Sequence, residues 1–148
     1  MQLMNSAAIW KVGGAIALAS AAGSVSAKTS QTWQLVGKSD DSLVMFYVDP
    51  KSATVHGPLR TAKLLYDYQQ VQQDPDTMIE TRSIVGLASF DCRGRRLGTV
   101  QSTSYANNMG KGKVVEKSDV QGPKAIRYVK AQPDSIDAKV LGFVCSLP

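Results

Sequence analysis

Short stretches of apolar and β-branched residues, separated by polar turns, dominate the chain after its first 30 residues. The strongest stretch covers residues 43–48 (LVMFYV), a composition typical of a β-strand. We expect this strand to end at Asp49-Pro50, because proline donates no hydrogen bond to a sheet. A shorter strand is predicted at residues 33–36, and the polar residues 37–42 between the two are predicted to form a turn.

Residues 60–71 alternate between two faces with the period of a strand. Leu64, Tyr66 and Tyr68 would lie on one face of it. The other face would carry Lys63, Leu65, Asp67 and Gln69. A helix is the alternative, since Gln, Leu and Lys are tolerated in helices, but the alternation and the paired tyrosines favour a strand.

Residues 78–106 are predicted to form one long β-hairpin with a basic tip. Residues 78–92 read as extended, Arg93-Gly94 supplies a tight turn, and residues 95–106 return, rich in Thr, Ser, Val and Tyr. Gly86 is predicted to mark a bulge in the first of these strands.

The last third of the chain is predicted to end in a helix. Residues 107–120, which contain NNMGKGK, are expected to be a flexible loop, and residues 125–129 (AIRYV) a last short strand. A helix is predicted to start near Asp134, which would cap it, with Asp137 reaching back three residues later. Its apolar residues fall on two sides, which suits a helix pressed onto a sheet: Ile136, Val140, Phe143 and Val144 on one, and Ala138, Leu141 and Cys145 on the other.

These elements predict an α+β fold: an antiparallel sheet of about six strands with a C-terminal helix packed on one face. No internal repeat and no domain boundary is visible, so residues 28–148 are predicted to form a single domain.

Residues 1–27 have the order of a secretory signal peptide. Lys11 is their only charged residue, the uncharged segment 12–22 follows it, and Val25 and Ala27 are small residues at −3 and −1 before Lys28. An uncleaved membrane anchor is the alternative, but the uncharged stretch is short for a span of about 20 mostly apolar residues. We therefore expect a periplasmic or secreted protein.

Cys92 and Cys145 are the two cysteines of the chain. In an exported protein two cysteines are expected to pair, and this pair would join the predicted helix to the strand that ends at Cys92. A redox or catalytic thiol is the alternative, but the chain has no CxxC motif and neither cysteine has a histidine near it in sequence.

Candidate chemistry is sparse. His56 is the one histidine of the chain and is interpreted as a solvated turn residue, because no partner motif for a catalytic triad accompanies it. Most aspartates lie in predicted turns, where Asp is common for backbone reasons, and the GKGK segment at residues 110–113 lacks the frame of a phosphate-binding loop. We expect no catalytic residue, no metal site and no enzymatic activity.

Arg93, Arg95 and Arg96 at the predicted hairpin tip are the candidate partner-binding residues. Arginine forks match carboxylate, sulfate and phosphate groups. Lys111 and Lys113 would extend this patch if their loop lay beside the tip. The alternative is a turn that only keeps the protein soluble. The net charge of +5 falls to +4 without Lys11 and is compatible with acidic partners.

The order of several short motifs resembles the surface-adhesin protein E family over roughly residues 32–145. The motifs are Trp33, Tyr47-Val48-Asp49-Pro50, Leu65-Tyr66-Asp67-Tyr68, Ser83, Asp91-Cys92, Tyr105, the segment from AIRYV to Pro133-Asp134-Ser135, and Val144-Cys145. The resemblance implies a six-stranded antiparallel sheet whose concave face holds a C-terminal helix through a disulfide. It also implies a lipid-anchored adhesin that binds host matrix and plasma proteins, and haem. This chain departs from the pattern because no lipobox cysteine follows its apolar segment, so attachment to the cell surface is not expected.

Two functions follow as hypotheses. The first is a non-enzymatic binding protein of the adhesin type, with a protein or an acidic ligand as partner and a homodimer as a possible assembly. The second is a periplasmic carrier of a small ligand such as haem, with His56, Met78, Met109 or a tyrosine as axial ligand, or another housekeeping protein of the periplasm. Nucleic acid is not an expected partner of an exported protein.

The leader analysis predicts cleavage of the bond between Ala27 and Lys28. Mass spectrometry of the protein recovered from the periplasm or medium should give an N-terminus at Lys28, because small residues at −3 and −1 direct signal peptidase to that bond. An intact Met1 on the exported protein would contradict this prediction.

Overall fold

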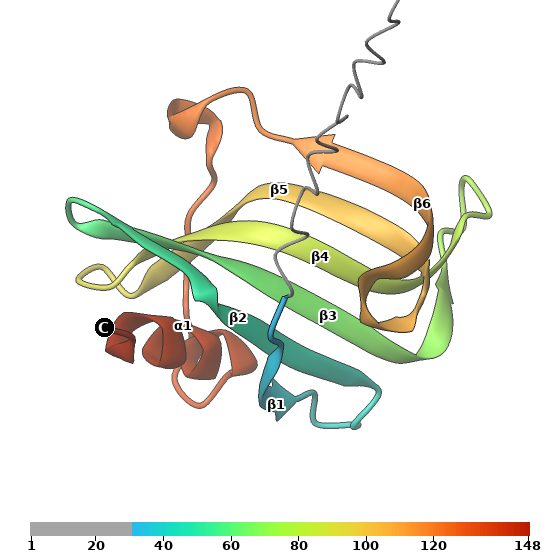
Figure 1. Cartoon of the computed structure of the whole chain (residues 1–148), viewed down its shortest axis with the longest axis horizontal. Helices are drawn as coiled ribbons and strands as arrows, with labels where there is room; N and C mark the ends of the chain where they lie inside the picture. Colours follow the sequence, from blue (N-terminus) through green and yellow to red (C-terminus); the bar gives the residue numbers. More distant parts are fainter. Residues whose placement is uncertain (1–30) are drawn as a thin grey trace, which may run out of the picture.

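The structure is a computed structural model that describes residues 31–148; the predicted signal peptide at residues 1–27 lies outside the described residues. An antiparallel sheet of seven strands carries one C-terminal helix, which confirms the α+β class (Figure 1). The strands are β1 (Gln34–Lys38), β2 (Val44–His56), β3 (Leu59–Gln73), β4 (Glu80–Asp91), β5 (Arg96–Asn107), β6 (Lys111–Asp119) and β7 (Val129–Lys130). The helix is α1 (Ile136–Ser146), and two short 3₁₀ turns are η1 (Asn108–Gly110) and η2 (Pro123–Ala125).

The sheet is a meander. Strands β1 to β6 neighbour one another in chain order, and β7 pairs with the start of β5. Every connection between β1 and β6 is therefore a local hairpin, and the predicted β3 strand and long β4–β5 hairpin are confirmed.

β2 does not end at Asp49-Pro50, as the sequence predicted, but continues to His56. Its pairing with β3 shifts between Asp49 and Thr54, so Pro50 lies where the ladder is interrupted. The Ser52 hydroxyl donates to the Asp49 carbonyl oxygen (2.6 Å) and accepts from the Lys63 amide (2.8 Å). The prediction was wrong because the Ser52 hydroxyl accepts the Lys63 amide hydrogen at the interruption, so the ladder resumes at Thr54 although Pro50 donates no hydrogen bond to it.

The predicted flexible loop at residues 107–120 is instead η1 followed by the strand β6. Asp67 is buried on the sheet face opposite to α1, and one of its carboxylate oxygens accepts from the Asn108 side-chain amide (3.1 Å) and the Met109 backbone amide (2.7 Å). Gly110 has φ of +66° and would place a Cβ 2.7 Å from Val85, so only glycine fits there. Tertiary hydrogen bonds thus order a segment whose composition predicts mobility.

Two smaller corrections concern strand irregularities. Gly86 is in register with Ser102, and the bulge lies on β5, where Val100 has no opposite residue between the pairs Leu87–Gln101 and Ala88–Thr99. The strand predicted at residues 125–129 is reduced to the two residues of β7.

The cap of α1 is Ser135 rather than Asp134. The Ser135 hydroxyl accepts from the Ala138 amide (3.1 Å), whereas Asp134 adopts a left-handed φ of +62°. Asp137 lies in the first turn, where its negative charge interacts favourably with the positive end of the helix dipole.

The hydrophobic core lies between α1 and the face of the sheet that it covers. Val140, Leu141 and Val144 of the helix are buried there. The sheet contributes Val48, Ala62, Leu64, Ala88 and Phe90 from the three central strands. Leu141 is buried although it lies on the second side of the helix, as expected for a helix pressed onto a curled sheet (Figure 1).

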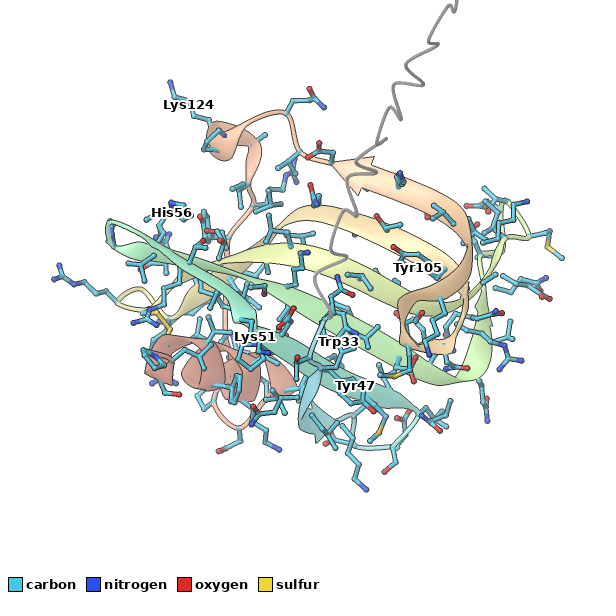
Figure 2. All side chains as sticks on the ribbon, viewed as in Figure 1. Trp33, Tyr47, Lys51, His56, Tyr105 and Lys124 are labelled. Atoms are coloured by element: carbon cyan, nitrogen blue, oxygen red, sulfur yellow. A yellow bond between two sulfur atoms is a disulfide. The ribbon has the colours of Figure 1, made fainter. Side chains whose placement is uncertain are left out.

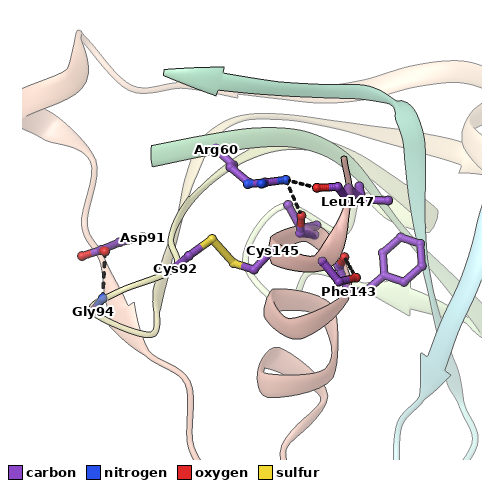
Figure 3. The surroundings of a disulfide bond; sticks show 9 residues. Arg60, Asp91, Cys92, Gly94, Phe143, Cys145 and Leu147 are labelled. Carbon is purple, nitrogen blue, oxygen red and sulfur yellow. Dashed lines mark hydrogen bonds between the residues drawn. A yellow bond between two sulfur atoms is a disulfide. The ribbon is translucent and has the colours of Figure 1, made fainter. Parts of the chain in front are cut away.

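Two tertiary contacts hold the end of α1 against the sheet. Cys92, at the end of β4, forms a disulfide with Cys145, with Cα atoms 5.9 Å apart (Figure 3). From β3, the Arg60 guanidinium donates to the carbonyl oxygens of Val144 and Leu147. These carbonyls lie at the C-terminal end of the helix, where acceptors lack partners within the helix.

Replacing both cysteines by serine is expected to lower the free energy of unfolding by about 4 kcal/mol, with less loss if the unfolded chain keeps structure. Urea unfolding of the oxidised protein and of the Cys92→Ser/Cys145→Ser variant measures the difference. Reduction of the original protein should reproduce it, and two free thiols in the natively purified protein would contradict the bond itself.

Candidate functional site

The arginine tip is the turn between β4 and β5, and it has a rigid base. Arg93 follows Cys92 directly, so the disulfide fixes the start of the turn on the helix end. The Gly94 amide donates to a carboxylate oxygen of Asp91 (2.8 Å), which closes the turn (Figure 3). The loop is therefore anchored on both sides of its exposed residues.

Arg96 has a structural partner that the other two arginines lack. Its guanidinium donates to Asp91 at 2.6 Å and 3.2 Å, the one ion pair among residues 31–148, and lies 5.5 Å from the centre of the Tyr128 ring. The Gly94 amide and then Arg96 hold the pKa of the Asp91 carboxyl below its usual value. The main role of Arg96 is therefore to stabilise the turn through its contact with Asp91.

Arg93 and Arg95 are exposed to solvent, and Arg95 adopts a left-handed φ of +52° at the turn. Lys130 of β7 is paired with Arg96 across the strands and is also exposed, which adds a third free cation beside the tip. The sequence did not identify Lys130, because nothing in its local pattern predicts that β7 returns to β5.

Lys111 and Lys113 do not join this patch, contrary to the extension that the sequence allowed. They lie at the start of β6, beside the opposite end of β5 from Arg96. At about 3.4 Å per residue, the length of β5 separates the two groups by roughly 35 Å.

A trough on the helix-bearing face is the second candidate site. Its body is a hollow of about 250 Å³ floored by Gly86 and Ala88 and flanked by Tyr66 and Tyr68. A second hollow of about 220 Å³ adjoins it, shares Tyr66, Ala88 and Thr99, and is lined at its outer end by Arg127 and Asp137. The 11-residue helix covers only part of this face, and its first turn forms one wall of the trough.

Tyr66 lies at the junction of the two hollows. Its ring packs edge-on against Phe46, with centroids 5.2 Å apart. Burial, and next the negative charge of Asp137, raises the pKa of Tyr66 to about 12, so its hydroxyl stays protonated at ordinary pH. The sequence predicted that Tyr66 and Tyr68 share a face but did not identify a site there.

The candidate haem ligands are spread over the molecule. His56 ends β2 at the same end of the sheet as the arginine tip and contacts Thr54 through a side-chain hydrogen bond (2.8 Å). Figure 2 places it far from Tyr105, near the other end of the sheet. Met78 and Met109 lie in the turns at that other end, and Met109 is on the face opposite to the trough. The haem prediction stays untested.

Among residues 31–148, no group of three His, Cys, Asp or Glu side chains is placed to hold a metal ion. None of the helices formed by these residues is long and apolar enough to cross a bilayer.

An antiparallel meander with a C-terminal helix bound to its sheet by a disulfide, and with an exposed basic turn, defines a small disulfide-bonded α+β domain. The family model of surface-adhesin protein E matches residues 33–146, and this chain belongs to that family. The chain matches none of the curated protein sequences.

Solved structures of protein E from Haemophilus influenzae have the same fold. One is 16% identical, with 79% of this chain and 85% of that chain covered and a TM-score of 0.54. A second crystal form is 14% identical, with 78% and 96% covered and a TM-score of 0.52. The selenomethionine form is 16% identical, with 68% and 78% covered and a TM-score of 0.51.

Tyr66 is expected to ionise well above the usual pH range of a tyrosine. Because its folded-state pKa is raised from 10.0 to about 12, the stability it contributes is complete below pH 10 and is lost as the pH rises toward 12. A pH titration of tyrosinate absorbance should show a late step that Tyr66→Phe removes and Tyr105→Phe leaves in place. Ionisation of all tyrosines near pH 10 in the folded protein would refute this.

Proposed function

We propose that this chain is an exported, non-enzymatic binding protein of the surface-adhesin E type and that the arginine tip is its contact surface. The observation that supports the proposal is the exposure of Arg93 and Arg95 on a turn whose base is fixed by Cys92–Cys145 and by Asp91. A fixed turn loses little conformational freedom on binding, so less of the interaction energy is spent on ordering it. The family to which the chain belongs gives the adhesin type.

The partner of this tip is an acidic ligand. Guanidinium groups pair with carboxylates, sulfates and phosphates through two parallel hydrogen bonds, and Lys130 adds a further positive charge beside them. Acidic segments of host matrix or plasma proteins, and sulfated polysaccharides, carry such groups. The predicted leader at residues 1–27 supports export to the periplasm or to the medium, where the protein would meet them.

Heparin is a convenient sulfated probe for this proposal. Replacing Arg93, Arg95 and Arg96 by serine should weaken heparin binding by roughly tenfold, and more at low salt, because exposed charges are screened by ions. Retention on a heparin column at several salt concentrations measures the change. The double variant Arg93→Ser/Arg95→Ser should give most of the loss, because Arg96 is already paired with Asp91 and contributes less to the ligand. This variant also leaves the contact that stabilises the turn in place.

Lys111, Lys113 and Lys117 of β6 provide a charge-matched control. Their replacement by serine removes the same number of positive charges from the far part of the sheet, and it should leave most of the retention unchanged. Equal losses in the two triple variants would mean that net charge, rather than the tip, governs binding. Unchanged retention of the arginine variants would exclude the tip as the contact surface.

A further inference from the structure

The trough has unused polar groups as well as an apolar floor. Tyr66, Tyr68, Thr99 and Ser102 line it, and within residues 31–148 none of their side-chain hydroxyls has a hydrogen-bond partner in the protein. Its floor is apolar because Gly86 and Ala88 face it from the centre of β4. An occupant would therefore meet a flat apolar base with hydroxyl groups at its rim.

Two residues of opposite charge, Arg127 and Asp137, line the second hollow of the same trough. Arg127 and Val129 line it from the segment that returns along β5, and Asp137 lines it from the first turn of α1. Neither Arg127 nor Asp137 forms an ion pair with any described residue. A ligand with a positive and a negative group on one carbon would satisfy both charges.

We propose that the trough is a binding site for a free aromatic amino acid. The ammonium group would bind the Asp137 carboxylate, the carboxylate would bind the Arg127 guanidinium, and the ring would lie over Gly86 and Ala88 beside Tyr66 and Tyr68. The charge pattern selects this occupant, because an apolar molecule without both groups would leave one or both charges unused.

The size of the trough agrees with this ligand class. A cavity of about 150 Å³ holds a benzene ring, so the hollow of about 250 Å³ accommodates a phenyl or indole ring and the hollow of about 220 Å³ accommodates the head group. The free hydroxyls of Thr99 and Ser102 would add partners for a ring that carries a polar atom, such as indole.

Titration of the full-length mature protein with L-phenylalanine and L-tryptophan, followed by amide NMR shifts, tests the site. We expect saturable shifts at Gly86, Thr99 and Ser102. Arg127→Gln and Asp137→Asn should each weaken binding by about tenfold to a hundredfold, because a hydrogen bond to a charged group contributes that much. Phenethylamine, which lacks the carboxylate, and 3-phenylpropionate, which lacks the ammonium, should bind more weakly by similar factors.

Three further variants separate binding from folding. Arg93→Gln and Asp134→Asn are matched charge controls outside the trough and should bind L-phenylalanine within a factor of about two of the original protein. Ser102→Leu fills the hollow without removing a charge and should abolish binding while the thermal unfolding midpoint stays near that of the original protein.

Absence of shifts at millimolar amino acid, shifts centred elsewhere, or analogues that bind as tightly as L-phenylalanine would overturn the proposal. The heparin experiment uses a different part of the molecule, so its result is independent of this one. Ser102→Leu should keep its heparin retention, and loss of both activities in that variant would contradict the separation of the two sites.

Discussion

The attachment of the C-terminal helix to the sheet is the constraint on which the rest of the structure depends. A helix of 11 residues is marginal in water by itself, and here its end is held by the Cys92–Cys145 bond and by the Arg60 guanidinium. With the helix in place, Val140 and Val144 close the core over Val48 and Phe90. Without it, one whole face of a single sheet would expose its apolar residues, and such a sheet is unstable alone.

The same attachment accounts for both candidate sites. Cys92 is next to Arg93, so the bond that holds the helix also fixes the base of the arginine tip. The helix is anchored near that end of the sheet and is short, so its first turn stops beside Tyr66 and leaves the face beyond it open. The tip and the trough therefore lie on a common rigid frame but differ in chemistry: the first offers cations, and the second an apolar floor with one cation and one anion at its end.

Most of the fold was predictable because it is built from local signals. Alternation predicted β3, and the turn residues Arg93-Gly94 predicted the β4–β5 hairpin. The two cysteines that follow a predicted secretory leader predicted the disulfide. The errors fall where distant groups override local preference. The hydrogen bond between Ser52 and Lys63 allows β2 to continue beyond Pro50. Asp67 and Ser83, on strands far away in sequence, accept hydrogen bonds that order the segment around Gly110.

The sequence by itself determined most of the elements, the covalent link and the cluster of three arginines, because each depends on residues that are close together in the chain or on a residue type present only twice. Only the tertiary structure decided which cations share a surface and where a hollow forms. It placed Lys130 beside the tip and Lys111 far from it, and it brought Gly86, Arg127 and Asp137 together from three separate segments. Strand register and the length of the helix decide which of these residues lie close together, and neither is encoded in the local spacing of the residues involved.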